Sequence, residues 1–305
     1  MDKINFFSDS LDIQNQKIIL RLDLNVPIKN KIILDDTRIM LCLPFINKLI
    51  EKRAKIIIIS HLGRPKGIKD PSLSLLPVYK YLKKKLRTNV YFFLGNFDNE
   101  LNDKFSYLKE GDVIIIENIR FYKEEEDNDE SFSKKLASLG EIYINDAFSC
   151  SHRKQSSIHC ITKFIDKSFA GPLLKKEIES IDLVLKNKRE PVTCIIGGSK
   201  ISTKIDVIKN LIPKFNNIIF VGGMANNILS YKGNRIGKSM SEENCESIIK
   251  EIFEISKNTL CEITYPEDVL IGKSADDDAQ IKDLKDIADD DLILDVGPKT
   301  LKRIK

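Results

Sequence analysis

The chain is 305 residues long and its charge is nearly balanced, since 49 Lys and Arg residues face 45 Asp and Glu residues for a net charge of +4. This balance argues against a nucleic-acid-binding protein, which needs a clearly basic face. Hydrophobic residues at 42% and charged residues at 31% are enough to bury a core. They exclude wholesale disorder, and the length predicts about two domains.

Neither export nor membrane insertion is indicated by the sequence. The longest purely aliphatic run, residues 56–59, is far too short to cross a bilayer. The first five residues lack the basic and apolar regions of a signal peptide. No Cys-x-x-Cys pair occurs, which is typical of reduced thiols in the cytosol; the scattered cysteines are Cys42, Cys150, Cys160, Cys194, Cys245 and Cys261. We therefore expect a cytoplasmic protein.

In chain order, short runs rich in Ile and Val alternate with segments that repeat apolar residues every three or four positions. Most of the runs are continuous, which is typical of strands buried on both faces of a parallel sheet. The predicted strands are residues 17–24, 54–61, 89–94, 112–118, 141–148, 191–197, 216–222, 262–271 and 291–296. This alternation predicts an α/β fold with mostly parallel sheets.

The clearest predicted helix covers residues 37–53, where Ile39, Leu43 and Ile46 share one stripe and Asp36 or Thr37 is the N-cap. The other predicted helices are residues 75–86, 130–139, 173–185, 203–212 and 242–256. Five strands precede the helix at 173–185 and four follow it, so we expect this helix to link two α/β units. We place the boundary near residues 168–171, which gives domains of residues 1–170 and 171–305.

Basic side chains occur where the strands of the first half end, or in the adjoining turns. Because ligands of open α/β sheets bind beyond the carboxyl ends of the strands, we expect these side chains to line one pocket. They are Arg38, Arg64, Arg120 and Arg153, with His61 and His152. Guanidinium groups suit phosphate and carboxylate oxygens, so the sequence predicts a pocket for a small, multiply charged anion.

Each of these residues also has a simpler interpretation. A single arginine is more often an ordinary surface residue, and either histidine can be structural. Asp23 and Asn25, at the end of the first predicted strand, can equally cap backbone groups. The repetition favours the anion pocket, because arginines at four such positions are much less expected by chance.

A glycine turn follows the first strand of the second half. Gly197 and Gly198 allow a phosphate to approach the backbone, and the helix predicted from residue 203 offers free N–H groups and the positive end of its dipole. Lys200 and Lys204 are four residues apart, so they lie on one face once the helix begins, although such lysine pairs usually face solvent. These features indicate a second phosphate-binding place.

The next strand ends at Gly222 and Gly223, where a ligand can again approach the backbone. Residues 233–239, Gly-Asn-Arg-Ile-Gly-Lys-Ser, are similar to a P-loop, but the spacing is one residue short and no strong strand directly precedes them. We interpret them as a loop before the helix at Glu242. Cys and His spacings of a metal site are absent, so no metal-ligating residue is predicted.

Several tracts of the chain, taken in order from about Lys17 to Thr300, resemble those of the phosphoglycerate kinase family. The matching tracts are Arg21-Leu22-Asp23-Leu24-Asn25-Val26-Pro27, Asp35-Asp36-Thr37-Arg38, Ser60-His61-Leu62-Gly63-Arg64-Pro65, Glu117-Asn118-Ile119-Arg120-Phe121-Tyr122, Asn145-Asp146-Ala147-Phe148, His152-Arg153, Gly197-Gly198-Ser199-Lys200 with Lys204, Gly222-Gly223-Met224-Ala225 and Asp295-Val296-Gly297-Pro298-Lys299-Thr300. So many motifs in the right order form a highly specific signal.

The resemblance implies two Rossmann-like lobes that transfer a phosphoryl group between 1,3-bisphosphoglycerate and ADP, giving 3-phosphoglycerate and ATP. The implied substrate residues of the N-terminal lobe are Asp23, Asn25, Arg38, His61, Arg64, Arg120 and Arg153. The implied nucleotide residues of the second lobe are Lys204, Gly197, Gly198, Gly222 and Gly223. The implied catalytic residues are Arg38 and Lys200, which stabilise the phosphoryl group in transfer, and Lys204, which contacts the nucleotide phosphates.

The chain departs from the family at its end. The family continues past Gly-Pro-Lys-Thr with an Asn-Gly-Pro tract and a Gly-Gly-Gly-Asp tract that serves the phosphates and Mg²⁺. We therefore expect an incomplete second lobe, a fragment of a longer gene product or the product of a frameshifted gene, and a protein ligand for the Mg²⁺ of ADP or ATP in the part not present. The alternative is a truncated, catalytically inactive protein that only binds 3-phosphoglycerate. By resemblance the protein is a monomer whose partners are these small molecules, not nucleic acid or membrane.

Overall fold

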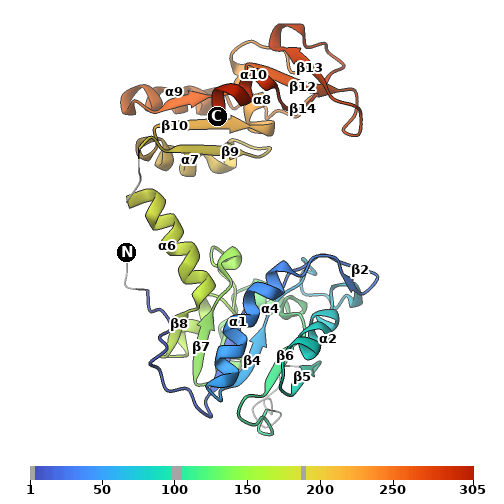
Figure 1. Cartoon of the computed structure of the whole chain (residues 1–305), viewed down its shortest axis with the longest axis vertical. Coiled ribbons are helices and arrows are strands. Elements are labelled where there is room, and N and C mark those ends of the chain that lie inside the picture. The colour runs from blue at the N-terminus through green and yellow to red at the C-terminus, as the bar shows by residue number, and fades with distance from the viewer. Residues whose placement is uncertain (1–3, 96, 98–104, 187–189) are drawn as a thin grey trace. The chain divides into compact units, whose positions relative to one another are not determined.

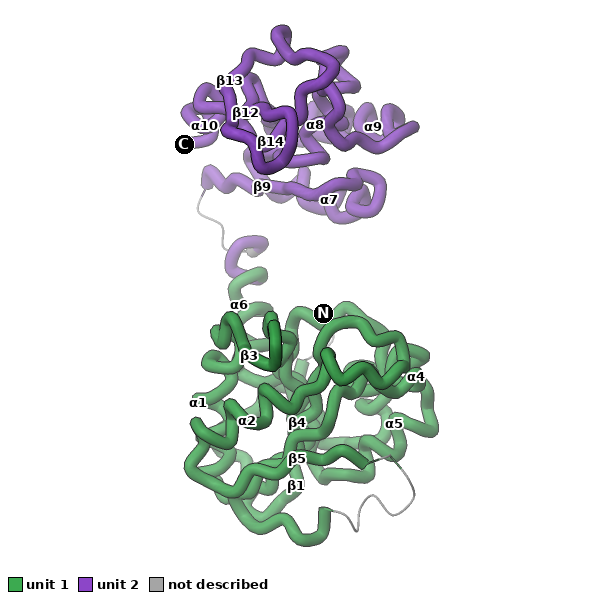
Figure 2. The backbone as a smooth tube through the Cα atoms, turned by 90° about the vertical axis from the view of Figure 1, so that its right-hand side faces the viewer, with its two compact units in different colours: residues 1–181 green, residues 182–305 purple. Residues whose placement is uncertain are grey.

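The computed structural model describes residues 4–95, 97, 105–186 and 190–305, and these form two compact units (Figure 2). The first unit comprises Met1–Ile181 and the second Asp182–Lys305. The division falls inside helix α6, Pro172–Lys186, whereas the sequence-based boundary at 170/171 lies just before that helix. Each unit is described by itself.

The first unit is built on one six-stranded sheet in which every pairing is parallel, in the order β5-β6-β4-β1-β7-β8 (Figure 1). The strands are β1 Lys17–Arg21, β4 Lys55–Ile59, β5 Val90–Phe93, β6 Val113–Ile116, β7 Ile142–Asn145 and β8 Ser168–Ala170. Parallel strands need crossover connections, and the register pairs the end of β1 with the ends of β4 and β7. The loops that follow these three strands therefore leave from the same edge of the sheet.

Two hydrophobic clusters cover the two faces of this sheet. Ile18 and Leu20 of β1 pack in one cluster, while Ile19 between them packs in the other, because successive side chains of a strand point to opposite faces. The first cluster takes in helices α1 Thr37–Glu51 and α2 Leu76–Lys85. The second takes in helix α5 Glu130–Ala137. Burial on both faces is the reason for the continuous Ile runs of the sequence.

Most strands of the first unit end earlier than predicted, because the polar residues that follow them form loops instead of continuing the ladder. After β1, the backbone is held by Ser60, whose Oγ accepts from Leu24 N at 3.0 Å and donates to the carbonyl of Leu22 at 2.8 Å. The sequence did not predict β8 or the hairpin formed by β2, Ile28–Lys29, and β3, Ile32–Ile33. Strands of two or three residues carry too little pattern to be detected.

The second unit contains two three-stranded sheets, and this corrects one prediction. The first sheet is parallel, in the order β11-β10-β9, from Glu262–Thr264, Asn217–Val221 and Thr193–Gly197. The second is antiparallel, in the order β13-β12-β14, from Gln280–Asp283, Asp268–Gly272 and Leu292–Val296. The single strand predicted for residues 262–271 was therefore wrong. Pro266, which lacks a backbone N–H, lies in the break between β11 and β12.

In the described part of the second unit, four α-helices follow these strands or join them. They are α7 Ile205–Leu211, α8 Gly222–Tyr231, α9 Glu246–Thr259 and α10 Pro298–Ile304. Helices α7, α8 and α9 pack on the parallel sheet through one cluster of buried side chains. Helix α8 was not predicted, because its two leading glycines resemble a turn. Helix α9 begins at Glu246, not at Glu242 as predicted.

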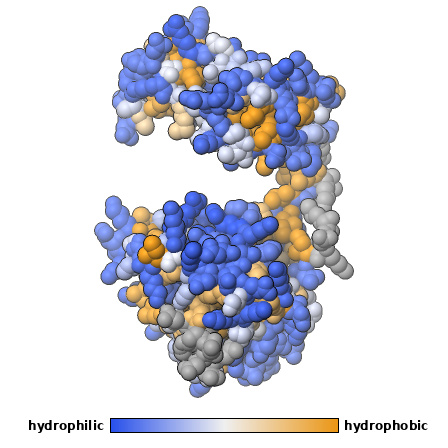
Figure 3. Space-filling view, turned by 180° about the vertical axis from the view of Figure 1, so that it is seen from behind, coloured by the Kyte–Doolittle hydropathy of each residue, from blue (hydrophilic) through white to orange (hydrophobic). Residues whose placement is uncertain are grey.

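The remaining helices are short, and none of the described helices is long and apolar enough to cross a membrane. Helix α4 covers Lys123–Glu126. The 3-10 helices are η1 Pro71–Leu73, η2 Ile119–Phe121, η3 Phe148–Cys150, η4 Cys160–Lys163, η5 Ser202–Lys204, η6 Ile212–Lys214 and η7 Leu284–Asp286. The face of the molecule in Figure 3 is mostly hydrophilic over both units, as expected when the aliphatic runs lie inside.

The tract that is similar to a P-loop has a structural role. Gly237 forms an isolated bridge with Leu292 at the start of β14. Lys238 N donates to the carbonyl of Asp291 at 2.8 Å, and Ser239 Oγ accepts from Ile293 N at 2.8 Å. In this tract, the residues that would face a phosphate in a P-loop instead hydrogen-bond to residues 291–293 at the edge of the antiparallel sheet.

Replacing Gly237 with Ala should destabilise the fold. Gly237 has a φ of +57°, and an added Cβ would clash with the carbonyl oxygen of Asp291 and lie 2.7 Å from that of Ala288. The matched control is Gly233→Ala, since Gly233 has a φ of +82° and open space around it. We expect the control to lose about 1 kcal/mol of unfolding free energy from backbone strain alone, and Gly237→Ala at least twice as much. Equal losses in urea unfolding would contradict the clash.

Candidate functional site

The loops at the carboxyl edge of the first sheet bring most of the predicted anion-binding residues together. Asp23 and Asn25 follow β1, and His61 follows β4. Arg120 lies in η2 after β6, and Arg153 follows η3 after β7. Arg38 is the second residue of α1. Strand ends of a parallel sheet meet at one edge, which is why residues so far apart in the sequence gather here.

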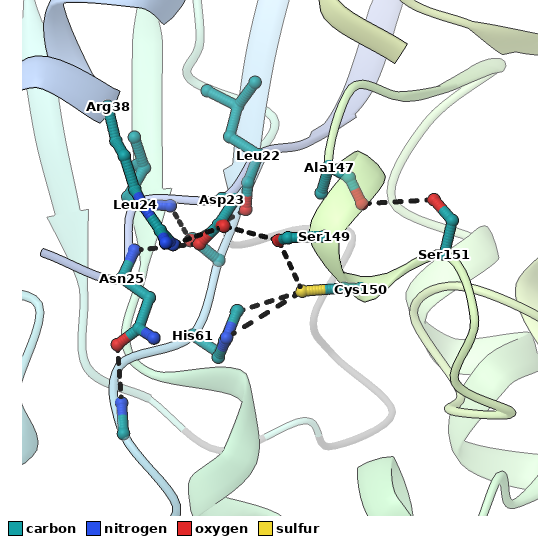
Figure 4. Close-up of polar contacts among 12 residues, drawn as sticks. Leu22, Asp23, Leu24, Asn25, Arg38, His61, Ala147, Ser149, Cys150 and Ser151 are labelled. Carbon is teal, nitrogen blue, oxygen red and sulfur yellow. Dashed lines mark hydrogen bonds and ion pairs between the residues drawn. The ribbon is translucent and has the colours of Figure 1, made fainter. Parts of the chain in front are cut away.

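Asp23 ties the loop after β1 to helix α1 and to η3 (Figure 4). Its Oδ2 accepts from Arg38 Nη1 at 2.5 Å and from the hydroxyl of Ser149, and its Oδ1 accepts from Asn25 N at 3.1 Å. Asn25 Oδ1 in turn accepts from Gly63 N at 2.9 Å. Half of the Arg38 side chain stays exposed, so its guanidinium group keeps N–H groups for an anion.

His61 is surrounded by positive charge. The residue is 4% exposed. Burial lowers the pKa of His61 to about 2, and the charges of Arg21, Arg120, Arg153 and Arg38 act in the same direction. His61 is therefore neutral at physiological pH, and it serves as a hydrogen-bonding group instead of a further cation.

Arg120 has unused binding capacity. The residue is 3% exposed, and its Nη1 donates to the carbonyl of Gly63 at 2.7 Å. Its Nε is buried without a partner among the described residues, and burial lowers the pKa of this guanidinium group. A buried donor without an acceptor is costly, so an anion at this place would stabilise it.

The other two predicted arginines differ from each other. Arg153 is partly buried, and its charge acts on both His61 and Arg120, which places it in the cluster. Arg64 is exposed and forms no hydrogen bond or ion pair within the described ranges. The structure therefore gathers Arg38, Arg120 and Arg153 around His61, and leaves Arg64 at the surface beside them.

Three residues of this region were not predicted. Arg21 is fully buried at the end of β1 and contacts His61. Ser149 bonds Asp23, and Cys150 Sγ lies 3.8 Å from His61 Nε2. A charged residue that ends an Ile and Leu run is a sequence signal for Arg21. Neither Ser149 nor Cys150 gives such a signal, because only the fold brings η3 against β4.

In the second unit, two glycine turns pack against each other. Gly198 has a φ of +142° and Gly222 a φ of +61°, conformations that other residues rarely adopt. Met224 N donates to the carbonyl of Gly198 at 2.7 Å, and a Cβ on Gly223 would lie 3.0 Å from that oxygen. With Gly197 at the end of β9, these residues form a compact backbone surface at the start of α8.

The sequence predicted that Lys200 and Lys204 lie on one face of an α-helix, and this prediction was wrong. Helix α7 begins at Ile205, so Lys200 precedes it in a loop and Lys204 ends the 3-10 helix η5. Both residues are exposed. The free N–H of Ser202 at the start of η5 is taken by the carboxylate of Glu242, at 3.1 Å. The expected open helix start is therefore already capped from within the chain.

A cavity of about 280 Å³ lies beside the glycine turns. It is lined by Ser199, Gly222, Gly223, Ala225, Asn226, Met240, Pro266 and residues 292–296 of β14. Its walls combine apolar side chains with the N-terminal turn of α8, a pairing that suits a flat apolar ring attached to phosphates. The sequence did not point to Met240 or β14 as lining residues.

No protein ligand for a metal can be assigned. Among the described residues, no group of three His, Cys, Asp or Glu side chains could hold a metal ion. Mg²⁺ with a nucleotide is held largely by phosphate oxygens and water, with one or two carboxylates. The side chains present here do not fit a metal site, and no step below depends on one.

The fold is that of an α/β protein, and the arginine cluster and the glycine turns are candidate places for phosphorylated anions. A phosphoglycerate kinase family model matches residues 8–305. The phosphoglycerate kinase of Wolbachia pipientis wMel is 44% identical over 297 residues, which are 97% of this chain and 74% of the relative. That of Dictyoglomus turgidum is 43% identical over 293 residues, 95% of this chain and 74% of the relative.

Solved structures agree with the sequence comparison. The structure of phosphoglycerate kinase from Coxiella burnetii has a TM-score of 0.81 and 35% identity, and the match covers 98% of this chain and 76% of that one. This chain belongs to the phosphoglycerate kinase family. It is a kinase that carries out glycolytic phosphoryl transfer. Nothing in these comparisons favours the alternative of an inactive, binding-only protein.

Asp146, at the edge of the first unit's site, makes stability depend on pH. The residue is 3% exposed, Oδ1 accepts from Leu174 N at 2.9 Å, and Oδ2 is buried without a partner in the described part of the chain. Burial raises its pKa to about 6. Because the pKa is higher in the folded state than the usual 3.8, protonation stabilises the fold at low pH, and this contribution is lost as the pH rises through 6.

Replacing Asp146 with Asn should therefore stabilise the protein relative to wild type at pH 7 more than at pH 5, by about 1–2 kcal/mol of unfolding free energy. The amide oxygen can still accept from Leu174 N. Urea unfolding at the two pH values measures this difference. Asp289→Asn, at an exposed loop position, is the control and should follow wild type. An Asp146→Asn effect of equal size at both pH values would contradict the raised pKa.

Proposed function

We propose that the first unit binds 3-phosphoglycerate and 1,3-bisphosphoglycerate through its arginine cluster. The proposed ligand residues are Asp23, Asn25, Arg38, His61, Arg64, Arg120 and Arg153. The observation that carries the proposal is the set of guanidinium groups around the neutral ring of His61, with the buried Nε of Arg120 unpaired. A substrate with a carboxylate at one end and a phosphate at the other supplies the acceptors that these donors lack.

We propose that the second unit binds ADP and ATP with Mg²⁺. Gly197, Gly198, Gly222 and Gly223 form the backbone surface against which phosphates lie, and the neighbouring cavity takes the base. Lys204 contacts the phosphates as an exposed point charge, and its Cε lies near Gly198. A Mg²⁺ ion that arrives with the nucleotide would supply further neutralisation of phosphate charge, and no side chain among the described residues is assigned to hold it.

The proposed phosphoryl transfer needs no protein nucleophile. A terminal oxygen of ADP attacks the phosphorus of the acyl phosphate, the bond from that phosphorus to the acyl oxygen breaks, and the carboxylate of 3-phosphoglycerate leaves. Such transfers depend on positioning and on neutralising the charge of the phosphoryl group. We assign that neutralisation to Arg38 and Lys200. Asp23 orients Arg38 through their 2.5 Å ion pair. We further propose that the enzyme is monomeric and cytoplasmic.

Replacing Arg38 with Ala should reduce kcat about 10²- to 10³-fold, because one charge that stabilises the transition state is lost. The KM for ATP should change little, since Arg38 belongs to the first unit. A coupled spectrophotometric assay measures both constants. The control is Arg87→Ala, an exposed arginine after α2 at the opposite end of the strands, which should keep normal turnover. An Arg38→Ala enzyme with near-normal kcat would contradict the assigned role.

Replacing Lys204 with Ala should weaken MgATP binding about tenfold, the effect of losing about 1.4 kcal/mol of binding free energy. Binding of 3-phosphoglycerate should be unchanged. Isothermal titration with each ligand separately tests both statements. Lys250→Ala changes an exposed lysine of α9 that pairs with Glu254, and it should leave both affinities intact. Loss of 3-phosphoglycerate binding instead of MgATP binding would reverse the assignment of the two units.

A further inference from the structure

A chain of buried polar groups lies under the arginine cluster. Arg21 is fully buried, its Nε donates to Ser157 Oγ at 3.0 Å, and a second nitrogen donates to the carbonyl of Leu22. The third, Nη2, lies 3.2 Å from Nδ1 of His61. A buried guanidinium group with its nitrogens directed at three acceptors is held in one orientation.

Glu125 of α4 fixes that orientation from the other side. It is fully buried, its Oε1 accepts from Ser157 Oγ at 2.6 Å, and its Oε2 accepts from Ser157 N at 2.8 Å. The Ser157 hydroxyl therefore donates a hydrogen bond to Glu125 and accepts one from Arg21. Burial raises the pKa of Glu125, while the charge of Arg21 and the bonds from Ser157 act in the opposite direction.

The donor on Arg21 decides which nitrogen of His61 carries the proton. A guanidinium group has five N–H donors and no acceptor, so Nδ1 of His61 must be the acceptor in this contact. The single ring proton of the neutral imidazole is then on Nε2. A second proton on Nδ1 would point at the Arg21 cation, and the other charges acting on the ring, those of Arg38, Arg120 and Arg153, are also positive.

The Nε2–H group of His61 has no strong hydrogen-bond acceptor among the described residues. Within the ranges that the structure describes, its neighbour is the sulfur of Cys150, which lies 3.8 Å from Nε2 and 3.9 Å from Nδ1 and is therefore not directed at Nε2 alone, and a thiol is a weak acceptor. The donor is thus left for an anionic oxygen. A neutral donor adds a hydrogen bond to the anion without adding a further charge to the arginine cluster.

We propose that Arg21, oriented by Ser157 and Glu125, is a positioning residue that holds His61 as the neutral tautomer with its proton on Nε2, ready to donate to the anionic substrate. The part that concerns the substrate rests on the proposed function. The part that concerns the tautomer does not, because it follows from contacts within the first unit. In this arrangement His61 is a donor throughout the reaction and exchanges no proton with the substrate.

Two-bond ¹H–¹⁵N correlation spectra of the ¹⁵N-labelled full chain test the tautomer directly. The signals of His61 are assigned by their loss in His61→Asn. We expect the Nε2–H tautomer with a hydrogen-bonded Nδ1, and no titration between pH 6 and 8. A proton on Nδ1, or a His61 that titrates in this range, overturns the proposal.

Variants test whether Arg21 is the cause. The double variant Arg21→Met with Glu125→Gln removes both buried charges together, so neither is left unpaired. We expect the Nδ1 signal to move to that of a free nitrogen. We expect the KM for 3-phosphoglycerate to rise about tenfold, the loss of one hydrogen bond to a charged group, with the KM for ATP within about twofold. An unchanged Nδ1 signal or an unchanged KM for 3-phosphoglycerate overturns the positioning role.

Two single variants complete the test. Glu125→Gln keeps Arg21, and its amide oxygen can still accept from the Ser157 hydroxyl that positions Arg21, so it is the matched control and should retain the wild-type Nδ1 signal. Arg21→Lys keeps the charge but cannot bond Ser157 and His61 together, and it provides the same readout if the double variant does not fold. If the tautomer is as expected but 3-phosphoglycerate leaves the His61 signals unmoved, the proposed substrate site fails while the tautomer assignment stands.

Discussion

Repulsion among guanidinium groups is the constraint on which the first unit depends. Arg21, Arg38, Arg120 and Arg153 all act on the same buried ring, and like charges gathered in a partly buried place destabilise a fold unless each has a partner. The chain gives Arg38 the carboxylate of Asp23, and it gives Arg120 a backbone carbonyl. Arg21 is held near Glu125 through Ser157. The guanidinium N–H groups that remain without a partner among the described residues, such as Nε of Arg120, favour a bound anion.

This arrangement is possible because the sheet beneath it is rigid. Strands β1, β4 and β6 are covered on both faces by aliphatic side chains, and their parallel pairing sends every following loop to one edge. Close packing of such a core leaves the strand ends little freedom. The loops and short helices that follow these strands can therefore carry charged residues at fixed distances.

In the second unit, the candidate phosphate site depends on glycines, whose lack of a side chain leaves the backbone accessible. Gly198 and Gly222 take backbone conformations with positive φ, and Gly223 lies against the carbonyl of Gly198 where a Cβ would crowd it. The exposed lysines bring charge to a surface that the glycines make accessible. The P-loop-like tract, by contrast, carries a glycine at 237 for a structural reason, since its partners are backbone atoms next to β14.

Sequence reasoning succeeded where a pattern is local. The Ile runs mark strands buried on both faces, and most helices of ten residues or more carry an apolar stripe. It failed at short or ambiguous elements. The strand predicted across 262–271 is interrupted near Pro266, α8 follows two glycines that imitate a turn, and β8 is too short to show a period.

By itself, the sequence determined the α/β class, the place of the arginines at strand ends and the resemblance to one kinase family, because each depends on residue type and spacing along the chain. Only the tertiary structure decided which of those arginines meet and that Glu242 caps the start of η5. It also placed Arg21 and Cys150 against His61. Such contacts join residues 40 and 89 positions apart, and no local pattern records them, since they are set by how strands and loops pack around a shared core.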